Sequence, residues 1–196
     1  MGFGEAHKAM FAAAAVAAVA VLFQVGGEPV RTAFAWDRSA LDEGEFWRLA
    51  TGHFVHLGWS HLALNLAGLA LVTWITGKAY GALRWLVIAI MALAAIDAGF
   101  WFFYDELDRY VGLSGLLHGL LVAGLFAGAV RRDREAMVLG ALVIGKLVWE
   151  QVAGPLPGSE STSGGAVIVD AHLYGAVGGL LGALLYWRRV RSDASI

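Results

Sequence analysis

The feature that most constrains this chain is a series of six long apolar stretches separated by polar segments. They lie at residues 9–25, 60–76, 82–103, 114–130, 136–153 and 171–187. Each is close to the roughly 20 residues that an α-helix needs to cross a hydrocarbon core about 30 Å thick. Only 15% of the 196 residues are charged, well below the roughly 25% of soluble domains. We therefore expect an all-α, polytopic membrane protein whose six transmembrane helices form one domain over residues 1–196.

The composition argues against several kinds of site. The chain has no cysteine, which rules out disulfides, thiolate metal sites and a cysteine nucleophile. It has neither a phosphate-binding glycine loop nor a basic stripe interleaved with aromatic residues, so we expect no cofactor of the nucleotide type and no nucleic-acid partner. His53, His56 and His61 could bind a metal, but no acid lies near them in the same segment, so no metal is expected.

The distribution of lysine and arginine predicts the orientation in the membrane. With a cytoplasmic N-terminus, nine of these residues fall in cytoplasmic segments: Lys8, Lys78, Arg84, Arg131, Arg132, Arg134, Arg188, Arg189 and Arg191. Four fall on the other side: Arg31, Arg38, Arg48 and Arg109. Because cytoplasmic loops carry the excess of positive charge, both termini are expected inside. The alternative is a cleaved signal peptide ending near residues 33–35, but its apolar run lies far from that site.

Two loops have a composition that indicates more than a simple connection between helices. Segment 26–59 contains several aromatic residues: Trp36, Phe46, Trp47, Phe54 and Trp59. Because aromatic residues favour the membrane–water boundary, part of this segment is expected in the interface. Segment 154–165 is rich in glycine, proline and serine, which is typical of a flexible loop. It comes just before the sixth stretch and is either a mobile gate or a plain connector.

Three apolar stretches carry polar groups at what should be one depth. Ser114, His172 and His61 each lie 16 or 17 residues before the first basic residue at the cytoplasmic end of their stretch. At the helical rise, this places all three roughly 24–25 Å from that end, on the outer side of the bilayer. Asn65 follows His61 on the same helix. Polar groups inside a membrane are costly and indicate a functional site.

These residue types suit nucleophilic catalysis. A serine hydroxyl needs a neighbouring base, and the imidazole of His172 titrates in a suitable range. The negative charge of a tetrahedral intermediate needs hydrogen-bond donors, and the Asn65 amide, the His61 ring and the Ser114 backbone N–H are candidates.

Glycines accompany both reactive residues. Gly112 and Gly115 flank Ser114 and allow a tight turn and close helix approach. Gly175 and Gly179 follow His172 at GxxxG spacing and give that helix a smooth face. We expect this face to bring the fourth and sixth helices together until Ser114 and His172 can hydrogen-bond.

Other charged residues have simpler interpretations. Lys146 and Glu150 lie four apart in the fifth stretch and can pair, facing the bundle or the membrane surface, with a substrate contact as the alternative. Asp170 lies two residues from His172, so it is expected to cap its helix rather than complete a triad. Asp97 is expected to find its partner on a neighbouring helix.

At these residues the chain resembles the rhomboid intramembrane serine proteases. The family's G-x-S-G motif reads Gly112-Leu113-Ser114-Gly115, its H-x-x-x-N element runs from His61 to Asn65, its A-H-x-x-G-x-x-x-G element runs from Ala171 to Gly179, and its W-R pair is Trp47-Arg48. The resemblance covers about residues 47–187. It implies a six-helix rhomboid-like bundle in which Ser114 and His172 form a Ser–His dyad. It assigns the oxyanion site to His61, Asn65 and the Ser114 backbone.

One position departs from the usual pattern. Many rhomboids have a tyrosine four residues after the serine, stacked under the base, and here that residue is His118. This resembles the rhombosortase branch of bacterial rhomboids, which is associated with proteins that end in a Gly-Gly-containing motif, a transmembrane helix and a basic cluster. The resemblance implies cleavage of this C-terminal tail for sorting to the surface, in the bacterial inner membrane, with the site facing the periplasm. His118 either supports His172 or is a second acid–base group.

Three other functions are weighed against this one. A general rhomboid would cut ordinary transmembrane helices near helix-breaking residues. A non-catalytic pseudoprotease would bind membrane clients without cleaving them. A transporter is disfavoured because the chain has no inverted repeat halves and one candidate intramembrane ion pair.

Overall fold

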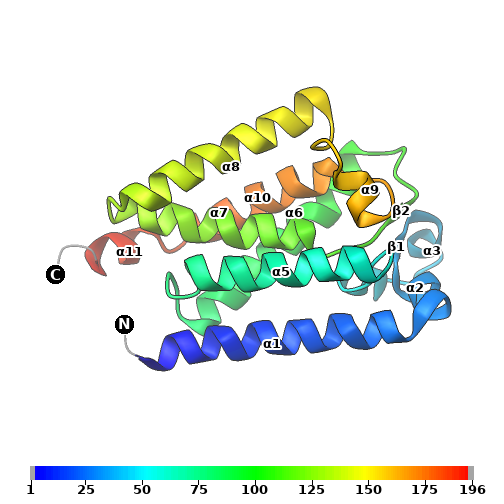
Figure 1. Ribbon diagram of the computed structural model, residues 1–196, viewed down its shortest axis with the longest axis horizontal. Coiled ribbons are helices and arrows are strands. Elements are labelled where there is room, and N and C mark those ends of the chain that lie inside the picture. Colours follow the sequence, from blue (N-terminus) through cyan, green and yellow to red (C-terminus); the bar gives the residue numbers. More distant parts are fainter. Residues whose placement is uncertain (1–2, 194–196) are drawn as a thin grey trace.

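The computed structural model describes residues 3–193 as a bundle of long helices that run alternately in opposite directions (Figure 1). The long helices are α1 (Phe3–Val25), α5 (Trp59–Thr76), α6 (Ala82–Phe103), α7 (Ser114–Val130), α8 (Arg134–Ala153) and α10 (Val169–Leu184). Helices α1, α5, α6 and α8 are long and apolar enough to cross a membrane, whereas α7 and α10 are shorter apolar helices. The helical membrane fold is therefore confirmed, and the number of six spanning helices stays a prediction.

Short elements gather at the end of the bundle where α1 finishes (Figure 1). They are α2 (Gly27–Phe34), β1 (Trp36–Asp37), α3 (Arg38–Asp42), α4 (Arg48–Thr51), β2 (Arg109–Tyr110) and α9 (Ser159–Ser163). Strands β1 and β2 pair antiparallel, which ties the first long loop to the segment that leads into α7. Helix α11 (Trp187–Asp193) lies at the opposite end. Helices α5, α7 and α10 all begin at the end with the short elements, as the predicted topology requires.

The start of α10 differs from the prediction. The helix begins at Val169, two residues earlier than expected, and ends at Leu184, so Trp187 belongs to α11. Ile168 is the N-cap and makes no side-chain cap hydrogen bond. Its side chain packs against the buried cluster around Trp36 and Phe100, which fixes the first turn at this position. The prediction that Asp170 caps the helix is therefore wrong.

The aromatic residues of segment 26–59 divide into two groups. Phe46, Trp47 and Trp59 are exposed, in keeping with the expected interfacial position. Trp36 is completely buried, and its ring meets Phe100 edge-on at 5.4 Å between centroids. Trp36 therefore anchors β1 to α6 and does not contribute to an interfacial surface.

Helix α10 packs between α6 and α7 and approaches both through glycine. A Cβ at Gly119 of α7 would lie 2.6 Å from the carbonyl oxygen of Gly175, and a Cβ at Gly179 would collide with the carbonyl oxygen of Gly119. Toward α6, a Cβ at Gly182 would lie 3.0 Å from the Cα of Ile88. Such backbone contact is a common way for membrane helices to associate, because lipid tails provide no hydrophobic driving force. Gly175 and Gly179 both lie on the α7 side, as their spacing predicts.

The close contact between α7 and α10 predicts a position-specific effect of added methyl groups. In Gly179→Ala the new Cβ has no room beside Gly119. We expect a loss of about 1–3 kcal/mol from overpacking, which lowers the apparent melting temperature in detergent by about 2–4 °C per kcal/mol. The matched control is Gly140→Ala on α8, where a Cβ meets nothing within 4 Å. Equal melting temperatures for the two variants would contradict the packing argument.

Candidate active site

Ser114 and His172 lie side by side at the end of the bundle that carries the short elements. Ser114 is the first residue of α7, and His172 lies in the first turn of α10. The distance between His172 Nε2 and Ser114 Oγ is 3.1 Å. Close helix contact allows this approach, because a Cβ at Gly115 would lie 2.8 Å from the carbonyl oxygen of Ala171. The structure therefore brings together the two residues that the sequence placed at one depth.

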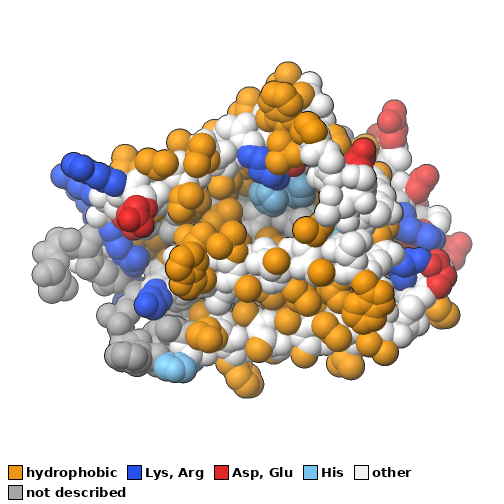
Figure 2. All heavy atoms as spheres, in the orientation of Figure 1, with side chains coloured by type: hydrophobic (Ala, Val, Ile, Leu, Met, Phe, Trp, Pro, Cys, Tyr) orange, Lys and Arg blue, Asp and Glu red, His pale blue; other side chains and the backbone are white. Residues whose placement is uncertain are grey.

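The pair lies in a cleft of about 610 Å³. Its walls come from α5, α7 and the segment around α9, and it is lined by five polar residues singled out from the sequence: His61, Asn65, Ser114, His118 and His172. Figure 2 shows histidine side chains within a hollow of this face, with a basic side chain beside them and hydrophobic side chains around the hollow. Segment 154–165, expected to be flexible, contains α9 and forms part of one wall. Its role as a gate stays a prediction.

His61 borders the same space from α5. Its Nδ1 accepts a hydrogen bond from the Leu57 N–H at 3.3 Å, so a neutral ring carries its hydrogen on Nε2. This edge of the ring lies against Gly112, where a Cβ would be 2.9 Å from Nε2. Gly112 also has a φ of +121°, which L side chains rarely adopt. Two independent constraints therefore require glycine at this position.

Asn65 and the start of α7 add two more donors. The buried Asn65 donates from Nδ2 to the carbonyl oxygen of His61 at 2.9 Å. An amide nitrogen carries two hydrogens, so one N–H is left for another acceptor. The Ser114 N–H belongs to the first turn of α7 and has no acceptor within the helix. His61, Asn65 and Ser114 therefore supply three candidate donors to one cleft.

A cluster of charged and aromatic side chains lies on the other side of His172. Glu150 of α8 is buried, and its two carboxylate oxygens are 3.0 and 3.1 Å from His172 Nδ1. Lys146 Nζ is 2.8 Å from Glu150 Oε2, so the predicted pair forms and faces the bundle. Lys146 Nζ also lies 2.7 Å from His118 Nε2 and 3.3 Å from His172 Nδ1. The contact of this pair with His172 was not predicted from the sequence.

The partners of the two rings define their tautomers. His118 Nδ1 is 2.7 Å from the Ser114 carbonyl oxygen, which can only accept, so Nδ1 carries the hydrogen and Nε2 accepts from Lys146. By the same argument, His172 Nδ1 donates to Glu150, and Nε2 presents its lone pair to the Ser114 hydroxyl. The rings stack, with centroids 4.2 Å apart and planes at 22°. Ser114 and His172 thus have an acidic third neighbour in Glu150 and a second imidazole ring stacked on His172.

The same cluster has the spacing of a metal site, since ligand atoms of His118, Glu150 and His172 lie within 4.8 Å of one another. Lys146 Nζ contacts all three, so its ammonium group already supplies positive charge at the centre. The donor set therefore suits the lysine better than a metal ion.

His53 and His56 lie outside the cleft. His53 Nε2 is 3.3 Å from Asp97 Oδ1, so Asp97 finds its partner on the segment after α4 and not on a neighbouring helix as expected. The His56 ring lies edge-on to His61 with centroids 5.0 Å apart. Burial, together with the neighbouring His61, lowers the pKa of His56 to about 3, which keeps its ring neutral. Within the described residues, His53, His56 and His61 form no joint metal cluster.

Comparison with known proteins identifies the family. Residues 43–189 match the rhomboid domain. The chain belongs to the rhomboid family. It is 28% identical over 149 residues to the rhomboid protease GluP of Bacillus subtilis (strain 168), which covers 76% of this chain. It is 32% identical over 145 residues to the rhomboid-like protease 5 of Toxoplasma gondii, which covers 70% of this chain.

This rhomboid spans only part of each of those relatives. The matched regions amount to 28% of the length of the Bacillus protein and 16% of the Toxoplasma protein. The family match and the helices long enough to cross a membrane identify an integral membrane protein.

The sequence of this rhomboid contains a signal for Glu150. Arg134 begins α8 at the end of the bundle far from the short elements, and Glu150 lies 16 residues after it. At the helical rise this distance is roughly 24 Å, the same depth as Ser114 and His172. The depth count was applied only to stretches that run toward the predicted cytoplasmic side. Applied also to α8, which runs in the opposite direction, it would have placed Glu150 in the plane of Ser114 and His172.

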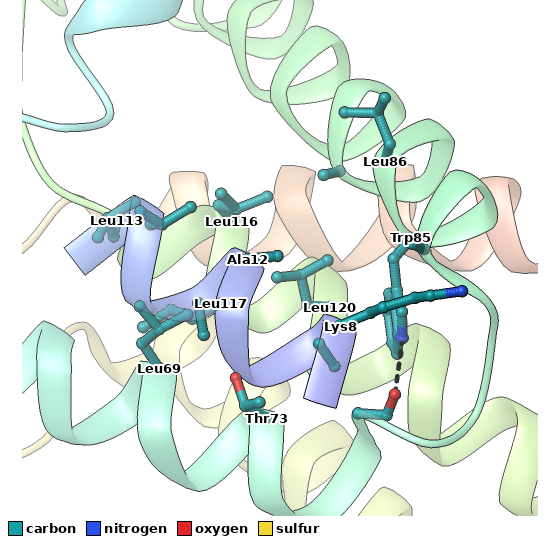
Figure 3. Close-up of a pocket in the computed structure, with 16 residues that line it drawn as sticks. Lys8, Ala12, Leu69, Thr73, Trp85, Leu86, Leu113, Leu116, Leu117 and Leu120 are labelled. Carbon is teal, nitrogen blue, oxygen red and sulfur yellow. Dashed lines mark hydrogen bonds between the residues drawn. The ribbon is translucent and has the colours of Figure 1, made fainter. Parts of the chain in front are cut away.

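A second cavity, of about 220 Å³, lies between α1, α5, α6 and α7 (Figure 3). Leu69, Leu86, Leu113 and Leu120 are among the residues that line it, and Trp85 donates a hydrogen bond to the Gly77 carbonyl oxygen at 3.3 Å. The described residues that line it include no histidine, aspartate or glutamate, and their one charged side chain is that of Lys8.

Arg48 of the W-R pair holds the loop beside the site. Its Nη1 donates to the carbonyl oxygens of Thr32 and Ala35, at 2.9 and 2.8 Å, and its Nε donates to Glu45 at 2.6 Å. The same loop reaches the serine motif, since the Gly112 N–H donates to the Gly52 carbonyl oxygen at 3.1 Å. Arg48 therefore supports the backbone that precedes Ser114.

The contacts of Arg48 predict a cost for even a conservative substitution. Lysine cannot reproduce the fork of donors, so Arg48→Lys leaves buried acceptors unpaired. We expect a loss on the order of 1–3 kcal/mol and faster limited proteolysis within residues 26–58. Arg109→Lys is the matched control, because Arg109 is exposed and its bond to Asp37 is worth about 0–1 kcal/mol. Proteolysis at the same rate in both variants would argue against this role.

Proposed function

We propose that this rhomboid is an intramembrane serine protease with Ser114 as nucleophile and His172 as general base. The observation that carries the proposal is the 3.1 Å approach of His172 Nε2 to Ser114 Oγ within a cleft. Because Nδ1 faces the Glu150 carboxylate, Nε2 is the nitrogen that can take the hydroxyl proton. Family membership and the names of the two relatives support the same activity.

The reaction follows from the positions of these groups. Ser114 Oγ attacks the scissile carbonyl carbon while its proton passes to His172 Nε2. The oxygen of the tetrahedral intermediate becomes negative and accepts hydrogen bonds from the His61 ring, the Asn65 amide and the Ser114 N–H. His172 then gives its proton to the leaving amine. In the second step, His172 takes a proton from the water that attacks the acyl-enzyme and returns it to Ser114 Oγ as the acid product leaves.

The cleft suits a substrate that arrives within the bilayer. Leu64 and Leu71 of α5 line it and are about half exposed, so its wall continues onto the apolar surface of the bundle. In Figure 1, α8 leans away from α5 above this region. A membrane-anchored protein segment can therefore approach Ser114 from the lipid side.

We further propose the rhombosortase type, with substrates that carry a C-terminal Gly-Gly motif and a transmembrane tail. Support comes from His118, whose ring stacks on His172 where many rhomboids have a tyrosine. The associated location is the bacterial inner membrane, with both termini cytoplasmic and the cleft toward the periplasm. The excess of lysine and arginine at the end opposite the cleft supports this orientation.

Labelling with a fluorophosphonate probe in detergent tests the protease proposal. We expect the wild type to be labelled, Ser114→Ala to be unlabelled, and His172→Ala to react at least about 100-fold more slowly, since general-base catalysis contributes about 10²–10⁴. Ser161→Ala, which changes an exposed serine near the cleft, should label like the wild type. A folded but unlabelled wild type would contradict the proposal and favour a client-binding pseudoprotease.

Co-expression with two kinds of substrate tests the rhombosortase assignment. One substrate carries a Gly-Gly motif before its C-terminal transmembrane helix, and the other is a conventional transmembrane substrate. We expect cleavage of the first, abolished by Ser114→Ala, and loss of cleavage when its Gly-Gly is changed to Leu-Leu. Mass spectrometry of the fragments locates the cut. Cleavage of the conventional substrate alone would identify a general rhomboid.

A further inference from the structure

The ion pair of α8 is the group of residues that the dyad mechanism leaves without a role. We propose that Glu150 and Lys146 are positioning residues that orient His172 and set its proton affinity with opposing charges. The reactive unit is then Ser114–His172–Glu150, with Lys146 as the counter-charge. The inference rests on the proposed protease function and deepens it.

Glu150 has the position of the orienting acid in a serine-hydrolase triad. Its side chain is 3% exposed, and both carboxylate oxygens face His172 Nδ1. The carboxylate fixes the tautomer in which Nε2 accepts from Ser114, and it stabilises the imidazolium that forms when the serine proton transfers. Asp170, the acid nearest in sequence, lies in the first turn of α10, and the hydrogen bonds of His172 go to α7 and α8.

Lys146 acts on the same ring with the opposite sign. Its ammonium nitrogen is 3.3 Å from His172 Nδ1 and 2.8 Å from Glu150 Oε2. Glu150 favours the protonated form of His172, whereas Lys146 disfavours it. Lys146 also donates to His118 Nε2 and so keeps the stacked ring neutral and in place beneath the base.

The neighbourhood of His172 contains few other groups that titrate. The charged and titratable side chains around it are His61 on α5, His118 on α7, Lys146 and Glu150 on α8, and Asp170 on its own helix. Among them Lys146 and Glu150 are the two that carry charge directly at Nδ1. Each can be neutralised separately, so the direction in which each substitution shifts the pH dependence of labelling tests the inference.

A purely structural role makes a different prediction from a positioning role. Glu150 is one of three buried residues of α8, with Ala136 and Leu147, so the ion pair also anchors this helix. An anchor that acts only on folding predicts that neutralising either partner lowers stability and activity alike, with an unchanged pH profile. If both are positioning residues, neutralising Glu150 and neutralising Lys146 should shift the pH profile in opposite directions.

The test measures the rate of fluorophosphonate labelling against pH for Glu150→Gln, Glu150→Asp, Lys146→Met and the control Glu135→Gln. Neutral His172 is the active form, so the rate rises with pH as the ring loses its proton. We expect Glu150→Gln to be at least about 100-fold slower, with the acidic limb moved to lower pH. Lys146→Met moves that limb to higher pH, because the imidazolium keeps Glu150 and loses the repelling ammonium. Glu150→Asp recovers part of the lost rate, and Glu135→Gln, exposed on the same helix, behaves like the wild type.

The melting temperature of each variant separates the outcomes. Parallel losses of stability and labelling with an unshifted pH profile would overturn the inference and leave a structural anchor. Shifts of the same sign in Glu150→Gln and Lys146→Met would also overturn it. Where Glu150→Gln does not fold, Glu150→Asp and Lys146→Met retain the carboxylate and decide the question. An unlabelled wild type would overturn the proposed function itself, whereas a labelled wild type with unshifted variants would overturn this inference alone.

Discussion

The backbone contact between α7 and α10 is the constraint on which the rest of the site depends. At Gly115 and Gly119 a single added carbon would meet a carbonyl oxygen of α10 within 2.8 Å. Only this separation lets Ser114, at the first residue of one helix, reach His172, in the first turn of the other. Hydrogen bonds weaken steeply as they lengthen, so a displacement by one atom's width would break the 3.1 Å contact. Helix packing in the membrane and the alignment of Ser114 with His172 are therefore one requirement.

Charge balance explains how so many polar groups can be buried behind the base. A lone lysine or glutamate inside a membrane bundle is costly, but Lys146 and Glu150 are 2.8 Å apart and neutralise each other. The neutral rings of His118 and His172 take up the remaining donors and acceptors of the pair. A proton gained by His172 then appears beside a carboxylate, which offsets the new charge. The same contacts pair the buried polar groups and, in the proposed mechanism, stabilise the protonated form of His172.

The sequence predicted the depth of the site better than the sides of the helices that face it. Counting residues from basic ends placed Ser114, His172 and His61 in one plane, and the structure gathers them around one cleft. Glu150 lies at the same depth, but the sequence does not indicate whether its side of α8 faces the bundle or the lipid. A membrane helix is apolar toward lipid and toward its neighbours, so hydrophobic periodicity does not reveal the inward face. Asp97 and Asp170 were misassigned for a related reason, because their surroundings depend on loops whose course depends on tertiary packing.

The position of α8 and the orientation of His172 depend on the same few atoms. Within residues 3–193, the side-chain hydrogen bonds from α8 to other helices come from Lys146 and Glu150, and little else of this helix is buried. An outward movement of α8 would lengthen the contacts to Nδ1, whereas its close approach restores them. The packing of α8 and the support of the His172 ring therefore depend on one ion pair.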